Sequence, residues 1–292
     1  MMMIVSALIT GLALGSMYGL LALGFHVTYA VSGTVNFSQG SSMTLGAVLG
    51  FFFIVLWGWP VPLGVAAVLV LCAAYGVAVE RFAVRPFVQR GSENWLMATV
   101  AVGIVVDNLV LFTFGKEPRS FPSVLAVKPI QLAEGAGVYP LQIVIPIVGI
   151  VLAAALSFVV RRTRLGIAML AVVQNPDAAR LMGIDVRRSV AASYAASAVL
   201  AGIAGLLIAP LFNVSSEMGT MFGLKAFAAA IIGGLGSAAG VMLAGVCLGL
   251  IEVFTTTYFG SVYTQLLTFA AVIVILVILP NGLLGRAGVK KV

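Results

Sequence analysis

The sequence predicts an all-α polytopic membrane protein with about eight membrane-spanning segments. Of the 292 residues, 62% are hydrophobic and only 9% are charged, and the mean hydropathy of +1.17 lies far above that of soluble domains. Apolar runs of nearly twenty residues recur along the chain, and a helix needs about twenty such residues to cross a bilayer. A transmembrane β-barrel would alternate apolar and polar residues in short strands, and the sequence has no such pattern.

The predicted spans are apolar runs that end at polar residues, glycine or proline. The amino terminus has no basic segment ahead of its apolar run, so we expect the first run to be a retained span rather than a cleaved signal peptide. Gly11, Gly15 and Gly19 recur at four-residue intervals in this run, a spacing that lets membrane helices pack closely. The spans cover residues 4–24, 38–58, 61–80, 95–114, 141–160, 189–210, 225–257 and 262–280.

Basic residues predict which loops face the cytoplasm, because Lys and Arg are in excess on that side of a membrane. Such loops also account for the net charge of +7 without a nucleic-acid partner. The loop of residues 115–140 mixes both charges and holds four prolines, and alternation of the spans places it outside. We therefore treat residues 1–292 as one transmembrane domain. The basic segments are residues 81–90, residues 161–188 with six arginines, and the tail with Arg286, Lys290 and Lys291.

The stretch of residues 225–257 is too long for one simple span and short for two. It must supply two passes or none, because residues 161–188 and the tail both lie inside. The sequence "GGLGS" breaks this stretch, so we expect a short or re-entrant limb before the break and a fuller limb after it, which would raise the number of segments to nine. Non-helical backbone at membrane depth is tolerated only where protein or a water-filled cavity covers it. Candidate substrate-pathway residues here are Gly233, Gly234, Gly236 and Ser237.

A second break, "VSGTVNFSQGSS" at residues 31–42, is uncharged and lies between strongly apolar stretches. Transporters often build binding sites from broken segments, whose backbone amide and carbonyl groups are free to bind. The alternative is a plain connecting loop. If the break lines a pathway, the candidate residues are Asn36, Ser38 and Gln39.

Two carboxylates and a histidine lie within the predicted spans or at their ends. Asp107 and Glu252 are costly at membrane depth, so each faces a partner or a cavity. A proton site or a pathway-lining group is the functional interpretation, and a hydrogen bond to a neighbouring helix is the favoured structural one. His26 is also expected to be structural. One histidine and two separated cysteines provide too few ligands for a zinc site, so no metal and no catalytic residue are expected.

The polar segment "QNPDAARLMGID" at residues 174–185 predicts a short cytoplasmic helix over residues 176–182. Asn175 caps it, Pro176 suits its first position, and Gly183 suits the left-handed residue that follows its end. Its apolar residues Ala178, Leu181 and Met182 share one face by their spacing, which serves either packing or docking.

This segment resembles the coupling loop of ABC-importer permeases. "DAARLMG" has the EAA-x-x-x-G spacing of that loop, with Asp177 in place of Glu, followed by Ala178, Ala179 and Gly183. Together with three further stretches, it is similar to the LivH-type permeases of branched-chain amino-acid ABC transporters over nearly the whole chain. Those stretches are "GSMYGLLALGFHVTYAVSGTVNFSQG" (15–40), "KAFAAAIIGGLGSAAGVMLAG" (225–245) and "LPNGLLGR" (279–286), and the first match extends over "RTRLGIAMLAVVQNPDAARLMGID" (162–185).

The resemblance implies an ABC-importer permease architecture in the bacterial inner membrane. A LivM-like second permease subunit would complete the pore, two cytoplasmic ATPase subunits would bind beneath it, and a periplasmic binding protein would deliver leucine, isoleucine or valine. The chain itself would be no enzyme and would bind no cofactor, because the partner ATPases use the ATP. By similarity, the residues that seat in an ATPase subunit are Asp177, Ala178, Ala179, Leu181, Met182 and Gly183.

Other functions stay open at this point. Related permeases that import urea, short amides or other amino acids share these sequence stretches. A proton-coupled secondary transporter that uses Asp107 or Glu252 is a different class, and it would need no ATPase-docking helix.

Overall fold

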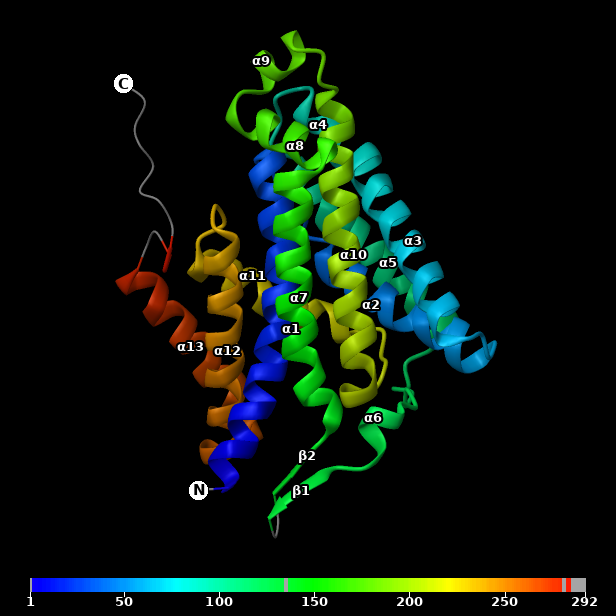
Figure 1. Ribbon diagram of the computed structural model, residues 1–292, viewed down its shortest axis with the longest axis vertical. Helices are drawn as coiled ribbons and strands as arrows, with labels where there is room; N and C mark the ends of the chain where they lie inside the picture. The colour runs from blue at the N-terminus through cyan, green and yellow to red at the C-terminus, as the bar shows by residue number, and fades with distance from the viewer. Residues whose placement is uncertain (1, 134–135, 280–281, 285–292) are drawn as a thin grey trace.

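Long helices run the height of the molecule in the computed structural model, which describes residues 2–133, 136–279 and 282–284 (Figure 1). Within this part of the chain, 8 helices are long and apolar enough to cross a membrane, so the predicted all-α polytopic fold is confirmed. These spans are α1 (Met2–Ser32), α2 (Gln39–Gly50) with the π-helix η1 (Phe51–Leu56), α3 (Val61–Val79) with η2 (Glu80–Val84) and α4 (Arg85–Val88), α5 (Trp95–Phe114), α7 (Pro140–Arg162), α10 (Val186–Phe212), α12 (Ala238–Phe259) and α13 (Ser261–Ile278).

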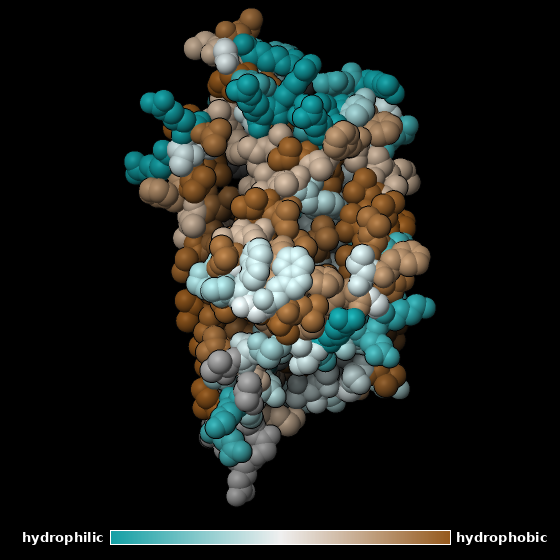
Figure 2. Space-filling view, turned by 90° about the vertical axis from the view of Figure 1, so that its right-hand side faces the viewer, coloured by the Kyte–Doolittle hydropathy of each residue, from teal (hydrophilic) through white to brown (hydrophobic). Residues whose placement is uncertain are grey.

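Helix α1 lies at the centre of the bundle and packs on α12, α10, α7 and α11 (Met218–Gly233). Leu20, Leu21 and Ala22 of α1 are fully buried in the core. The most exposed spans are α3, α5, α7 and α13 at the periphery. Figure 2 shows that hydrophobic side chains dominate the middle of one face, between hydrophilic ends, as a bilayer requires.

Small residues let the central helices touch through their backbones. Gly15 of α1 faces Gly245 and Gly249 of α12, and a Cβ atom on Gly15 would lie 2.6 Å from Val246 Cα. Gly202 of α10 lies against α2 in the same way. The close packing expected from the four-residue glycine spacing in α1 is therefore confirmed.

The first predicted span ends too early. Helix α1 continues through Thr28 to Ser32, eight residues beyond the expected end at residue 24. The hydroxyls of Thr28 and Ser32 donate to carbonyl oxygens of the preceding turn, and the first residue that leaves helical geometry is Gly33, with φ +68°. The hydroxyls of Thr28 and Ser32 are thus satisfied within the helix itself, which lets α1 include polar residues beyond the apolar run.

The expected break between residues 225 and 257 is confirmed. Helix α11 has 16 residues and α12 has 22, which are the short limb and the fuller limb. Gly234, with φ +85°, leads the turn between them, and Ser237 caps α12 by accepting a hydrogen bond from Gly240 N at 3.2 Å.

The two long loops lie at opposite ends of the molecule, as predicted (Figure 1). Helices α8 (Arg164–Gln174) and α9 (Pro176–Leu181) lie with α4 at the basic end. Two elements that the sequence did not predict lie at the other end, with the start of α1. They are helix α6 (Val124–Val127) and the hairpin of β1 (Ile130–Ala133) and β2 (Ala136–Val138). With the basic end inside, α1 starts outside. The basic tail residues Arg286, Lys290 and Lys291 lie outside the described residues.

The basic segment of residues 81–90 is largely helical rather than a loop. Buried Glu80 accepts two hydrogen bonds from Arg85, from Nη2 to Oε2 at 2.6 Å and from Nε to Oε1 at 3.0 Å. This two-pronged pair neutralises the carboxylate, so the helix continues past it to Val88.

Replacing Gly15 by Ala is expected to lower the free energy of unfolding by about 1–3 kcal/mol, because the new methyl group overpacks the contact between α1 and α12. The thermal midpoint of the purified protein in detergent measures this change. Gly149→Ala in α7 is the matched control, since it adds the same methyl group where the nearest atom, Ser16 Cβ, lies at an ordinary 3.4 Å. Equal midpoints for the two variants would contradict the prediction.

Candidate functional site

Helix α9 has defined caps at both ends. Asn175 Oδ1 accepts hydrogen bonds from the N–H groups of Asp177 and Ala178, each at 3.0 Å. At the other end Gly183 has φ +80° and donates to Arg180 O, while Ile184 N donates to Ala179 O, both at 3.0 Å. This is a Schellman ending, so the helix predicted over residues 176–182 is confirmed to within one residue.

Helix α9 lies near the tip of the basic end (Figure 1), and its apolar side chains are exposed there. Leu181 is 88% exposed and Met182 is 82% exposed, and Ala178 is exposed beside them. Ala179, in contrast, is only 4% exposed and faces the protein's own helices. Figure 2 shows hydrophobic atoms at this tip above a layer of hydrophilic side chains. Leu181 and Met182 are therefore available to a partner, and Ala179 anchors the helix.

In the polar break (residues 31–42), the side chains of Asn36, Ser38 and Gln39 are fully buried, and they form hydrogen bonds. Asn36 Oδ1 accepts from Ser38 N at 3.1 Å and from Ser38 Oγ at 2.7 Å. Gln39 Nε2 donates to Ser197 O at 3.1 Å, and Ser197 Oγ lies 2.9 Å from both Gln39 Oε1 and Gly24 O. The break thus joins α2 to α1 and α10.

The glycine break (residues 233–237) also contacts α1. His26 Nδ1 lies 2.7 Å from Leu235 O, so Nδ1 carries the proton and the structural interpretation of this histidine is confirmed. Gly233 and Gly234 are buried, Ser237 is half-buried and Gly236 is exposed.

Both breaks meet α1 at the same level. Gln39 lies against Gly24, and Leu235 bonds to His26 two residues further on. Phe227 of α11 packs its ring against Phe25 and Phe37, with centroids 5.5 Å and 5.0 Å away. The structure therefore brings the two candidate pathway segments together around one turn of α1.

A buried ion pair holds α11 to α12. Lys225 Nζ lies 2.6 Å from Glu252 Oε1, and Tyr18 of α1 donates to Glu252 Oε2 at 2.8 Å. The side chains of Lys225 and Glu252 are only 10% and 13% exposed. The structural interpretation of Glu252 is thus confirmed. Lys225 was not predicted as a functional residue, because it lies at the predicted start of a span. Opposite charges on either side of the predicted break could have revealed the pair.

Asp107 is less completely satisfied. Thr220 Oγ1 of α11 donates to its Oδ2 at 3.2 Å. Its Oδ1 is buried and has no hydrogen-bond partner among the described residues. Asn108, in contrast, donates to Ile104 O of its own helix at 2.8 Å.

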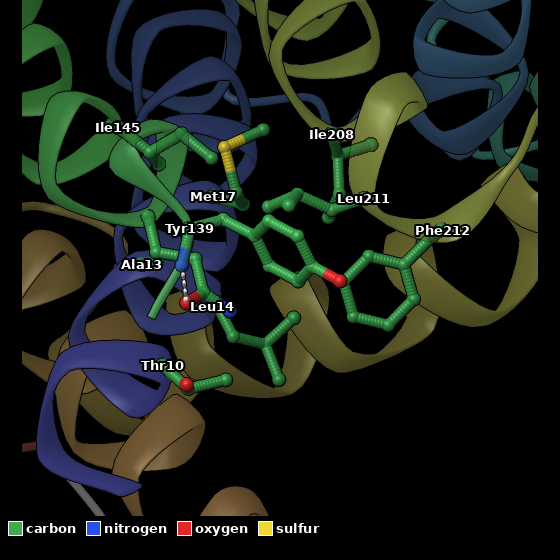
Figure 3. Close-up of a pocket in the computed structure, with 10 residues that line it drawn as sticks. Thr10, Ala13, Leu14, Met17, Tyr139, Ile145, Ile208, Leu211 and Phe212 are labelled. Atoms are coloured by element: carbon green, nitrogen blue, oxygen red, sulfur yellow. Dashed lines mark hydrogen bonds between the residues drawn. The ribbon is translucent and has the colours of Figure 1, made fainter. Parts of the chain in front are cut away.

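A cavity of about 110 Å³ lies between α1, α7 and α10, toward the end of the molecule opposite the basic end (Figure 3). Its lining is mainly apolar, with Thr10 and Tyr139 supplying hydroxyls, and none of its lining residues belongs to either break. Among the residues that line this cavity, the Tyr139 phenol is the one ionisable group.

Comparison with known proteins decides the family. Residues 7–277 match the family model described as "Branched-chain amino acid transport system / permease component". This chain belongs to that family. The resemblance to LivH-type permeases found in the sequence is therefore confirmed, and the protein is a multi-pass membrane permease. The stretch "LPNGLLGR" lies partly outside the described residues.

Relatives of this permease cover almost its full length. The LivH permease protein of Escherichia coli K12 is 32% identical over 97% of this chain and 96% of its own. The BraD permease protein of Pseudomonas aeruginosa is 31% identical over 98% and 97%. The probable LivH of Methanocaldococcus jannaschii is 29% identical over 91% and 88%. No solved structure matches the permease.

The ion pair predicts a non-additive pair of mutations. Lys225→Met leaves Glu252 as an uncompensated charge and is expected to lower the free energy of unfolding by about 3–5 kcal/mol. Adding Glu252→Gln removes that charge and is expected to restore most of the loss. Thermal midpoints in detergent measure both effects. A double variant no more stable than Lys225→Met alone would show that charge pairing is not the cause.

Proposed function

We propose that this chain is the permease subunit of an ATP-driven ABC importer that carries leucine, isoleucine and valine across the bacterial inner membrane. The observation that carries this proposal is the family match, supported by full-length relatives named for high-affinity branched-chain amino acid transport. Such similarity in both length and sequence favours a shared transport role.

Helix α9 supports an ATPase partner. Two large apolar side chains, Leu181 and Met182, stand almost fully exposed at the basic, cytoplasmic end of the molecule. Exposed apolar groups on a rigid, capped helix favour an interaction site. In this proposal the helix seats in an ATPase subunit through Asp177, Ala178, Leu181, Met182 and Gly183, while Ala179 holds it to the permease.

The remaining components follow from the same proposal. A LivM-like second permease subunit completes the pore, two ATPase subunits bind ATP, and a periplasmic binding protein delivers the amino acid. In this proposal ATP is hydrolysed by those separate ATPase subunits, and this chain binds no cofactor.

We place the substrate passage beside the two breaks. Both interrupt helices at membrane depth, and both meet one turn of α1, through the contact of Gln39 with Gly24 and the bond between His26 and Leu235 O. In the present conformation the polar break is closed, so transport requires these contacts to rearrange. The pathway residues of this proposal are Asn36, Ser38, Gln39, Gly233, Gly234, Gly236 and Ser237.

Reconstitution tests the proposed function. The permease pair, the ATPase subunits and the binding protein are assembled in vesicles, and uptake of radiolabelled L-leucine is measured. Uptake is expected to need ATP and the binding protein and to be insensitive to a protonophore at constant ATP. Uptake driven by a proton gradient without ATP would instead assign a secondary transporter.

Replacing Leu181 and Met182 together by Asp is expected to reduce both leucine uptake and ATP hydrolysis at least about tenfold, because central apolar contacts dominate interface energies. The amount of permease in the membrane should not change, since neither side chain packs in the core. Gln89→Asp is the control, because it adds a negative charge at another exposed site of the same end. Wild-type uptake by the double variant would rule out this docking role.

A further inference from the structure

Unpartnered polar atoms gather around the start of α2. Of the four buried side-chain N and O atoms without a hydrogen-bond partner in the described part of the chain, three are Asn36 Nδ2, Tyr75 OH and Asp107 Oδ1. Asn36 lies just before α2, and Tyr75 of α3 lies near Ser38. Buried polar groups are almost always paired in native proteins, so such a concentration calls for a water, an ion or a ligand as a partner.

Asp107 belongs to this group by position. Its helix, α5, packs on α2, and Ser41 of α2 donates to Gly103 O, one turn before Asp107. Ser41 also lies beside the Asp107 carboxylate. The carboxylate therefore sits over the first turn of α2, between α5 and Thr220 of α11.

No cation of the described residues neutralises this carboxylate. The ion pairs in that part of the chain do not include Asp107, and Lys225, the cation of α11, is bound to Glu252. Asp107 is the thirteenth of the 20 residues of α5, well inside the span. A half-buried carboxylate at that depth cannot face lipid at low cost, so it faces a partner or an aqueous passage.

We propose that Asp107 binds the ammonium group of the transported amino acid, and that the hydroxyl of Tyr75 donates a hydrogen bond to the carboxylate of that amino acid. This inference rests on the proposed function. An ammonium group has three N–H donors, and a carboxylate accepts such bonds strongly. Thr220 Oγ1 already holds Oδ2, which leaves Oδ1 to accept. The site is thus complementary to a zwitterion. Asp107 accepts from the ammonium group, and the Tyr75 hydroxyl donates to the carboxylate of the amino acid.

Apolar side chains on α11, the helix of Thr220, suit the aliphatic part of such a ligand. Leu224 follows Thr220 by one turn of α11, and Met221 lies next to it, and both are exposed at membrane depth. Flexible Met and Leu side chains accept branched aliphatic groups of several shapes. A zwitterionic head at Asp107 and an aliphatic tail on α11 describe a neutral apolar amino acid.

Three variants of the complete importer in vesicles test this site. Asp107→Asn removes the charge, Tyr75→Phe removes only an unpartnered hydroxyl, and Asn108→Leu is the control on the same helix. Uptake of radiolabelled L-leucine and ATP hydrolysis stimulated by the loaded binding protein are measured in parallel. Loss of a structural group would change assembly or both rates together, whereas loss of a ligand contact lowers the leucine carried per ATP.

Asp107→Asn is expected to reduce leucine uptake about tenfold or more, the effect of losing a hydrogen bond to a charged group, while ATP hydrolysis continues. Tyr75→Phe is expected to reduce uptake severalfold, and Asn108→Leu should stay within about twofold, as exposed substitutions usually do. If Tyr75→Phe alone is neutral, Tyr75 does not belong to the site.

Two results would overturn the inference. One is wild-type uptake by Asp107→Asn, and the other is a parallel loss of uptake, ATP hydrolysis and subunit assembly, which would make Asp107 a structural residue or the partner of a cation on the second permease subunit. Failure of the proposed function is separate, because it would be seen in the wild-type importer as an absence of leucine uptake.

Discussion

The bilayer requires that every backbone group leaving helical geometry at membrane depth be covered by protein or water, and the architecture of this permease meets that requirement around α1. The polar break is covered through Gln39, which bonds to Ser197 and lies on Gly24. The glycine break is covered through the bond between His26 and Leu235 O. Helix α1 must be long and central because it supports both interruptions at once.

The two carboxylates in the spans differ in how completely their charge is compensated by partners. Glu252 has a lysine and a tyrosine hydroxyl as partners, so its cost is offset inside the chain. Asp107 has one hydroxyl and a buried oxygen without a partner among the described residues. A fully paired carboxylate stabilises helix packing, whereas an incompletely paired one keeps the capacity to bind. The distinction depends on tertiary contacts and therefore cannot be made from the sequence.

Features encoded by short stretches of sequence were predictable. Asn175, Pro176 and Gly183 define α9 by local capping, and the glycines after Ile232 define the break before α12. The end of α1 was not predictable from hydropathy, because Thr28 and Ser32 satisfy their hydroxyls on their own helix. The partner of Lys225 lies on the next helix, α12, whereas the partner of Asp107 lies on α11, 113 residues further along the chain. Local rules thus predicted elements and breaks, but not the polar contacts that join them.

Helix α10 connects α9 to the polar break. Asp185, two residues after Gly183, caps α10 by accepting from Arg188 N at 3.1 Å, so α9 and α10 are joined by a short, bonded turn. Along the same helix, Ser197 bonds to Gln39 and to Gly24 O. If α9 docks on an ATPase as proposed, its displacement would be passed along α10 to Ser197 and the residues of the polar break. A docking helix placed elsewhere on the cytoplasmic end would lack this direct route, since packed helices move as units while loops absorb displacement.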